Sequence, residues 1–229
     1  MTRDLLKNIE FIDILSRRSG TAEASNLSIR NYTSKEDCIS SYKNNGFFSY
    51  GYHPWHLDQD SDELCSLHDL ISSSKCLAIG ETGIDRVNLS YSLKEQLSSF
   101  HKHIELSEQI QKPLIIHCVK GYSELLEAYK RYSPTQSWII HDFNHNKDFL
   151  NAIRTKRIYI SLGRNFFERK NSKVNKATKD IELEKLFFET DEMNIEIYEV
   201  YKKFCDNTEL EMKELKKNIK TNFEKVFMP

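Results

Sequence analysis

The stretch over residues 77–85 constrains this chain most, because an apolar run ends there in closely spaced glycines and carboxylates. A short apolar run of this kind is typical of a strand buried in a parallel sheet. Gly80 and Gly83 allow the backbone to turn, so we expect the strand to end at Gly80 in a tight turn. Glu81 then stands at the mouth of a sheet, where α/β folds bind ligands and metals. Taken alone, the stretch is more often a simple strand-to-loop turn with a solvated glutamate.

Apolar runs alternate with longer amphipathic segments along the chain, and this alternation predicts βαβ units around a parallel sheet. The predicted strands are residues 9–15, 27–32, 47–52, 76–80, 114–118, 138–142, 158–162 and 186–190. The predicted helices are residues 92–111, 122–132, 147–156, 195–206 and 209–227. Ser92 and Glu95 have the spacing of a capping box, and Pro113 ends that helix before the next strand.

Eight predicted strands within 229 residues indicate an α/β fold, a compact (β/α)8 TIM barrel formed by a single domain over residues 1–229. The alternative is an open, doubly wound sheet. That alternative is disfavoured, because no glycine-rich dinucleotide loop or Walker-type loop follows the first predicted strand.

The composition excludes several classes of protein. Hydrophobic residues make up 39% and charged residues 29%, which is typical of a globular rather than a disordered chain. The net charge of −1 excludes a passive nucleic-acid coat, so any nucleic-acid contact is local. The five cysteines are scattered without a CxxC pair and favour a reducing compartment. Because no apolar run has the length of a signal or a membrane span, we expect a cytoplasmic protein without a membrane partner.

Five polar residues each follow a predicted strand: His53, Glu81, His117, His141 and Asp191. The carboxyl ends of parallel strands share one face, so we expect these side chains to converge there. Imidazole and carboxylate ligands suit a divalent metal, and the absence of thiolates disfavours a structural zinc site. Each histidine taken singly is more often a structural residue, and Asp191 fits a helix cap. Five such placements together favour one shared site.

Other candidate residues near these strand ends are not expected to act as nucleophiles or metal ligands. Cys118 adjoins His117, but neighbours on a strand point to opposite faces, so we expect Cys118 to be buried rather than paired as a nucleophile. No GxSxG nucleophile motif occurs. Pro54 and Trp55 suggest that the loop carrying His53 contacts substrate instead of metal. Four further histidines fall in helices or loops and are placed outside the site: His68, His101, His103 and His145.

In order and spacing, the motifs resemble those of the TatD family of metal-dependent hydrolases. They read Gly-Tyr-His-Pro at residues 51–54, Gly-Glu-Thr-Gly-Ile-Asp at 80–85, Ile-His-Cys at 116–118, Ile-His-Asp-Phe at 140–143, Glu-Thr-Asp at 189–191 and Thr-Asn-Phe-Glu-Lys-Val-Phe at 221–227. The resemblance covers nearly the whole chain and implies a (β/α)8 barrel of the amidohydrolase type. It also implies 3′–5′ exonuclease or DNase activity on DNA, and in some members on RNA.

The resemblance implies a role for each candidate residue. Glu81 is similar to the carboxylate that bridges two metals, and His117 and His141 are similar to ligands of one of them. Asp191 is similar to the acid that binds the other metal and activates water. His53 is similar to a residue that faces the scissile phosphate.

The chain departs from the family at the first strand, where the family has an Asp-x-His-x-His motif. Leu15 and Arg17 stand in place of the two histidines. Leucine has no lone pair, and arginine carries only donors. At about 4 Å and an effective dielectric of about 20, Arg17 repels a cation by roughly 4 kcal/mol per unit charge. We therefore expect one tight divalent-metal site (Mg, Mn or Zn) rather than two, with Arg17 as a candidate phosphate-binding residue.

Two hypotheses follow from this departure. The first is a metal-dependent phosphodiesterase that acts on DNA, and on RNA as a further substrate, with one metal position impaired. The alternative is a catalytically impaired barrel that binds nucleic acid or a protein partner. For either hypothesis we expect a monomer.

Overall fold

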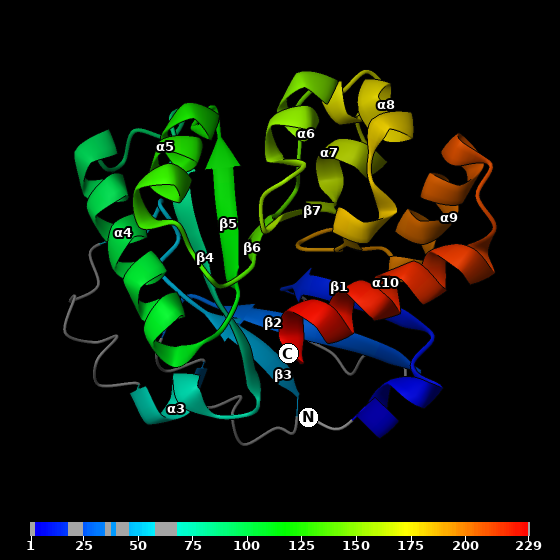
Figure 1. Cartoon of the computed structure of the whole chain (residues 1–229), viewed down its shortest axis with the longest axis horizontal. Coiled ribbons are helices and arrows are strands. Elements are labelled where there is room, and N and C mark those ends of the chain that lie inside the picture. The colour runs from blue at the N-terminus through cyan, green and yellow to red at the C-terminus, as the bar shows by residue number, and fades with distance from the viewer. Residues whose placement is uncertain (1–2, 18–24, 35–37, 40–45, 58–67, 229) are drawn as a thin grey trace. The chain divides into compact units, whose positions relative to one another are not determined.

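The computed structural model describes residues 3–17, 25–34, 38–39, 46–57 and 68–228 (Figure 1). Its strands follow one another in the sheet in chain order, β1 to β8. They are β1 (Phe11–Ser16), β2 (Asn26–Tyr32), β3 (Phe47–Tyr50), β4 (Cys76–Asp85), β5 (Leu114–Val119), β6 (Trp138–Ile140), β7 (Ile158–Leu162) and β8 (Leu186–Phe188). Parallel strands in chain order with helices between them have the (β/α)8 pattern, as predicted.

Each of the five predicted helices is present, with ends that differ by a few residues. The helices are η1 (Arg3–Asn8), α3 (His68–Ser72), α4 (Leu93–Ile110), α5 (Tyr122–Tyr132), α6 (Lys147–Ile153), α7 (Arg164–Phe167), α8 (Lys173–Ala177), η2 (Thr178–Asp180), η3 (Leu183–Lys185), α9 (Ile197–Thr208) and α10 (Met212–Phe227). The helices that the sequence did not predict have only three to six residues, too few to show a helical period.

Contacts divide the chain into two compact units, which are described separately. Residues 31–140 form the central unit, and residues 1–30 and 141–229 form the terminal unit. The single domain predicted over residues 1–229 stays a prediction.

In the central unit, α4 and α5 lie beside β4 and β5 (Figure 1). Helix α4 begins with the predicted capping box, in which Ser92 and Glu95 each bond the other's backbone amide. The helix buries Phe100 against Trp138 of β6, with ring centroids 5.6 Å apart. Both side chains are fully buried, and each contributes about 2 kcal/mol or more through apolar burial.

Strand β4 differs from the prediction that it ends in a turn at Gly80, because it continues to Asp85. Gly80 and Gly83 have φ angles of 129° and 142°, which side chains of L-residues rarely adopt. A Cβ on Gly83 would overlap the carbonyl oxygen of His117 on β5. The glycines therefore let the strand shift its register against β5 and approach it closely, rather than leave the sheet.

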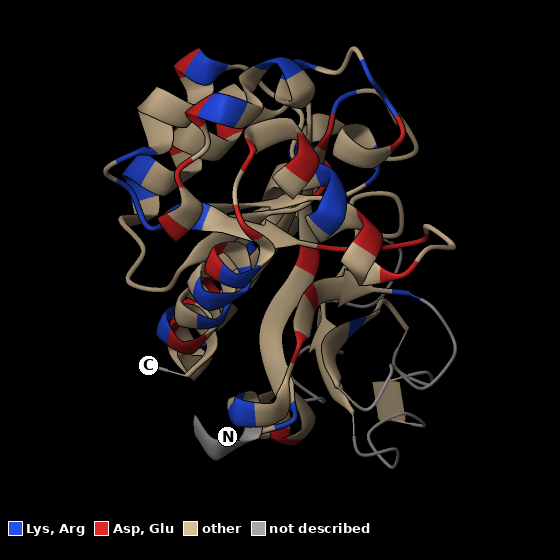
Figure 2. Ribbon diagram, turned by 90° about the vertical axis from the view of Figure 1, so that its right-hand side faces the viewer, with Lys and Arg blue, Asp and Glu red and all other residues tan. Residues whose placement is uncertain are grey.

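In the terminal unit, α9 and α10 pack against β1 and β8. The Tyr201 hydroxyl of α9 donates to the carbonyl oxygen of Ile12 at 2.9 Å and accepts the amide of Ile12 at 3.2 Å. Helix α10 carries basic residues, with fewer acidic ones, along its ribbon, as expected for an outer helix with a solvated face (Figure 2). Within the described residues, no helix is long and apolar enough to cross a membrane.

Candidate metal centre

The central unit brings three predicted site residues together. His53 lies in the loop after β3, Glu81 in β4 and His117 in β5. One ligand atom from each lies within 4.8 Å of the others. All three side chains are buried, with exposed fractions of 5%, 1% and 8%. Two imidazoles and one carboxylate at this spacing have the donor chemistry of a Zn²⁺ or Mn²⁺ site.

The backbone around Glu81 is held from several sides. The side-chain amide of Asn31 donates to the carbonyl oxygen of Gly80 at 2.7 Å and to the Ser49 hydroxyl at 3.0 Å. A Cβ on Gly51 would lie 2.7 Å from the Cα of Gly80, so the loop after β3 runs directly against β4. This close packing fixes the buried carboxylate of Glu81 on rigid strand backbone.

Asp85, at the end of β4, is a site residue to which the sequence assigned no role. Its Oδ2 lies 3.1 Å from Nε2 of His117 and accepts the indole N–H of Trp55 at 2.7 Å. Its Oδ1 accepts the amides of Val87 and Asn88 at 2.8 and 3.0 Å. Burial alone would raise the pKa of Asp85, but these hydrogen bonds, led by that from His117, hold the pKa well below its usual value.

The contact with Asp85 also determines which ring nitrogen of His117 carries the proton. A carboxylate accepts, so Nε2 of His117 carries the proton and Nδ1 keeps a lone pair for a metal. A histidine ligand whose other nitrogen donates to a carboxylate is a recurring arrangement at metal centres.

His53 is held in a different way. Its Nδ1 accepts the backbone amide of Trp55 at 3.2 Å, so in the neutral ring Nε2 carries the proton. The ring contacts His117 edge-on, with centroids 4.4 Å apart. His53 therefore offers a donor beside the other two residues, which suits a phosphate oxygen at least as well as a metal.

In the terminal unit, Arg17 pairs with Asp191. Residues 16 and 191 form a parallel bridge, and the amide of Asp191 donates to the carbonyl oxygen of Leu15 at 2.9 Å. The Nε of Arg17 lies 3.4 Å from Oδ1 of Asp191, and its Nη1 lies 3.8 Å from Glu192. A guanidinium thus stands beside the carboxylate for which the sequence predicts a cation. Leu15 is completely buried.

Asp13 of β1 bonds the residue that directly precedes Asp191. Thr190 donates to Asp13 through its amide at 3.0 Å and through its hydroxyl at 2.6 Å. Burial raises the pKa of Asp13 to about 7 against these bonds. Asp13 thereby fixes the backbone directly before Asp191.

His141, also in the terminal unit, is oriented by Glu189, for which the sequence suggested at most a helix cap. Oε1 of Glu189 lies 3.2 Å from Nδ1 of His141 and accepts the amide of Asp142 at 2.8 Å. Glu189 is completely buried, and a Cβ on Gly163 would lie 2.8 Å from the same oxygen. Burial, followed by the charge of Glu189, raises the pKa of Asp142 to about 7. The Glu-Thr-Asp run was the sequence signal that could have found Glu189.

The predicted site residues thus fall into two groups, one in each unit. Glu81 and His117 lie together with His53, whereas His141 and Asp191 belong to the terminal unit. The convergence of the two groups stays a prediction of the sequence. Cys118 is buried as expected, and burial raises the pKa of its thiol.

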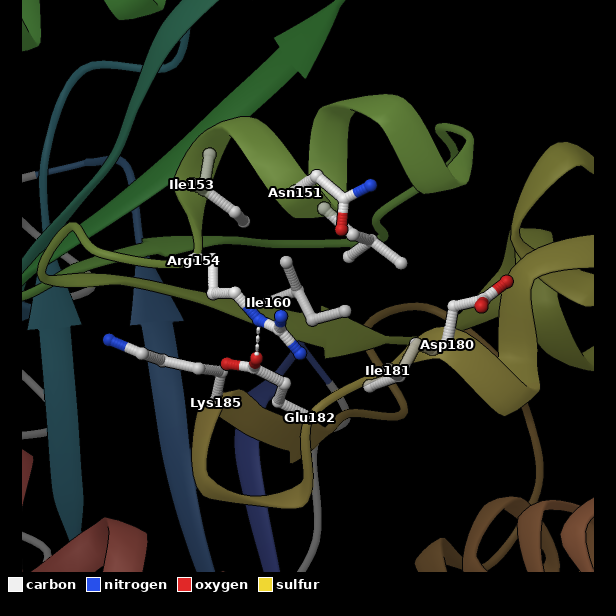
Figure 3. A pocket seen from close by; sticks show the side chains of 9 residues that line it. Asn151, Ile153, Arg154, Ile160, Asp180, Ile181, Glu182 and Lys185 are labelled. Atoms are coloured by element: carbon white, nitrogen blue, oxygen red, sulfur yellow. Dashed lines mark hydrogen bonds and ion pairs between the residues drawn. The ribbon is translucent and has the colours of Figure 1, made fainter.

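A small pocket lies elsewhere, between α6, β7 and the segment from η2 to η3 (Figure 3). An ion pair between Arg154 and Glu182 crosses it. None of the predicted site residues lines this pocket, and we assign it no role.

Comparison with known proteins gives a family match over almost the whole chain. A sequence model described as "TatD related DNase" matches residues 14–228. An uncharacterized metal-dependent hydrolase of Buchnera aphidicola subsp. Baizongia pistaciae is 28% identical over 149 residues, which are 64% of this chain and 56% of that protein. A protein of Edwardsiella piscicida named "3'-5' ssDNA/RNA exonuclease TatD" is 26% identical over 148 residues, 64% of this chain and 55% of that protein. The chain therefore spans a little over half the length of these relatives.

Solved structures share the fold over most of the chain. A TatD homologue of Escherichia coli K12 superposes with a TM-score of 0.81 at 19% identity, covering 96% of this chain and 98% of its own. A TatD family hydrolase of Entamoeba histolytica superposes with a TM-score of 0.78 at 18% identity, covering 96% and 99%. At such identities the likeness shows the fold alone, and the predicted (β/α)8 barrel is confirmed.

Proposed function

Because this chain belongs to the TatD related DNase family of metal-dependent hydrolases, we propose that it cleaves phosphodiester bonds in single-stranded DNA, and in RNA as a further substrate. The observation that carries the proposal is the buried group of His53, Glu81 and His117, with ligand atoms within 4.8 Å of one another. A buried carboxylate among imidazoles is costly without a cation, and this arrangement suits a metal centre.

Glu81 and His117 are the residues of the central unit that would hold the metal. The sequence resemblance adds His141 and Asp191 to the ligand set, and that part of the proposal rests on the sequence. Bound there, a divalent ion (Zn, Mn or Mg) would supply an activated water and would polarise the phosphoryl oxygen.

The chain's own residues supply the rest of the mechanism. Asp85 keeps the proton of His117 on Nε2, so the lone pair of Nδ1 would be the one to bind a metal. His53 presents Nε2–H to a phosphate oxygen and stabilises the charge that develops there. Asp191 takes the proton from the attacking water as general base.

The pairing of Arg17 with Asp191 supports one metal site rather than two. A guanidinium 3.4 Å from the Asp191 carboxylate already neutralises the charge that a second cation would meet. Arg17 also has the donor geometry that phosphate prefers. The substrate phosphate and Arg17 then take the place of the second metal.

The same ion pair favours a second candidate function. With Leu15 and Arg17 in place of two histidine ligands, the chain would be a catalytically impaired barrel that binds nucleic acid or a protein without cleaving it. The scattered cysteines keep a cytoplasmic location as our expectation, and we expect a monomer.

Nuclease turnover separates the two functions. We would measure cleavage of a single-stranded DNA oligomer with Mg²⁺ or Mn²⁺ for the native chain, for Leu15→His with Arg17→His, and for Glu81→Gln. Activity of the native chain that Glu81→Gln abolishes supports the hydrolase. Activity only after the double substitution supports the impaired barrel. If metal titration finds no binding to either chain, the ligand assignment is wrong.

A further inference from the structure

Five large hydrophobic side chains are exposed among the described residues: Ile39, Trp55, Val87, Leu89 and Tyr198. Trp55, Val87 and Leu89 belong to the two loops that follow β3 and β4, with exposed fractions of 42%, 57% and 82%. We call these three side chains the apolar rim. Trp55 and the residues after β4 meet at Asp85, and exposed apolar side chains beside one another mark a binding surface more often than scattered ones do.

One carboxylate holds both loops of the apolar rim. Asp85 accepts the indole N–H of Trp55 on Oδ2, and it accepts the amides of Val87 and Asn88 on Oδ1. The same Oδ2 also bonds His117 of the candidate metal centre. The apolar rim and the centre therefore share a single anchoring group.

The Trp55 indole is fixed although it is exposed. Its ring meets the rings of His53 and His117 edge-on, with centroids 4.9 and 5.9 Å away. Its N–H is held by Asp85 at 2.7 Å. An aromatic ring that is already ordered loses little conformational entropy when a ligand stacks on it.

We propose that the apolar rim is a stacking platform for a nucleobase of single-stranded nucleic acid, with Trp55 as the stacking ring. This proposal rests on the proposed function, because it assumes that the phosphodiester lies at the neighbouring metal centre. A net charge of −1 gives the chain little general attraction for a phosphate backbone, so contacts to the bases would add binding energy that the local phosphate contacts do not supply. Stacking on an exposed aromatic ring supplies such energy with little dependence on sequence.

The test compares two oligomers of equal length and charge. Binding of a fluorescently labelled oligo(dT) and of an abasic oligomer is measured in EDTA, where neither is cleaved. We expect oligo(dT) to bind about tenfold more tightly than the abasic oligomer, and we expect Trp55→Ala to remove most of that preference. Trp55→Phe should keep part of it, because phenylalanine retains a ring although it loses the bond to Asp85.

Tyr198 provides the matched control, since it is an equally exposed aromatic residue, with a fraction of 42%, on α9 of the terminal unit. Tyr198→Ala should leave the preference unchanged. Tryptophan fluorescence gives a second readout, because Trp138 is completely buried and quenching by oligo(dT) would report Trp55. Equal binding of the two oligomers by the native chain, or an unchanged preference in Trp55→Ala, would overturn the platform.

The outcomes also separate this inference from the proposed function. If the chain prefers oligo(dT) but neither binds metal nor cleaves DNA, the stacking platform is supported and the proposed hydrolase function is wrong. If the chain cleaves both oligomers with Mn²⁺ at equal rates and binds them equally, the hydrolase function is supported and the stacking platform is wrong.

Discussion

Nε2 of His117 lies 3.1 Å from Oδ2 of Asp85, and this contact joins the candidate metal centre to two surface loops. The carboxylate sits between a ring that is proposed to bind metal and an indole that is exposed to solvent. Its geometry leads to the first prediction.

Replacing Asp85 by asparagine should weaken metal binding by about 10–100-fold, because His117 loses the carboxylate that fixes its tautomer. Isothermal titration with Zn²⁺ or Mn²⁺ measures the affinity directly. Asp206→Asn removes the same charge from the exposed face of α9 and serves as the control. Equal affinities in the two variants would show that Asp85 plays no part in holding the metal.

His53 and His117 should respond differently to truncation. His117→Ala removes a proposed ligand, so metal affinity should fall by more than tenfold. His53→Ala removes a proposed phosphate donor, so turnover should fall by about 10²-fold while metal affinity changes little. Metal titration and single-turnover cleavage of single-stranded DNA distinguish the two. A comparable loss of metal affinity in His53→Ala would make His53 a third ligand instead.

The double substitution Leu15→His with Arg17→His should raise the number of bound metal ions per chain from one to two. It removes the guanidinium beside Asp191 and supplies two imidazoles that can ligate. Metal content after dialysis, measured by mass spectrometry, gives the stoichiometry. Arg169→His changes an exposed arginine in the same unit and should leave the metal content unchanged. An unaltered ratio in the double variant would contradict the assignment of residues 15 and 17.

Gly83→Ala should destabilise the chain by at least about 3 kcal/mol, because strain at a φ of 142° adds to overlap with the backbone of His117. Gly121→Ala meets the buried side chain of Ile84 rather than backbone, and Gly121 has an ordinary φ of −108°, so the substitution should cost less, about 1–3 kcal/mol through overpacking. Urea unfolding measures both free energies of unfolding. A similar cost at the two positions would argue against the close approach of β4 to β5.

Acid should weaken the fold through His103. This histidine is completely buried in α4, where Nδ1 donates to the Ser99 carbonyl and Nε2 accepts the amide of Tyr52. Burial lowers its pKa from 6.5 to about 4, so the unfolded chain binds the proton more tightly than the folded chain does. The stability present above pH 6.5 is therefore lost as the pH falls towards 4, by about 3 kcal/mol.

The matched variant for this effect is His103→Gln, which keeps a donor and an acceptor but does not titrate. The free energy of unfolding of the native chain should fall relative to the variant between pH 7 and pH 4. Asp13, whose pKa is raised to about 7, gives the opposite pH dependence, but both chains share it and it cancels in the difference. A difference that stays constant with pH would contradict the assignment of His103.

Most strands were predictable because they are short apolar runs buried on both faces, whereas β2 alternates buried residues with partly exposed ones. The capping box of α4 was predictable for a similar reason, since Ser92 and Glu95 are three residues apart and meet within one turn. Both features depend only on residues that are close together in the sequence, so the sequence alone predicts them.

Features that depend on distant residues were not predictable from the sequence. The glycines of β4 indicated a turn, yet the close approach of Gly83 to His117 keeps the strand in the sheet. Asp85 and Glu189 orient histidines 32 and 48 residues away in the chain, and no local pattern reports such partners. The family resemblance drew attention to Arg17, but its pairing with Asp191 arises from the fold, because the two residues lie far apart in the chain.

The bond between Tyr201 and Ile12 has a consequence for biosynthesis. The two residues are separated by 189 positions, so Tyr201 is synthesised long after Ile12. The central unit, in contrast, is one continuous segment. During translation β1 therefore lacks its contacts with α9 until the intervening segment has been made, and an unpaired strand of this kind is prone to aggregate.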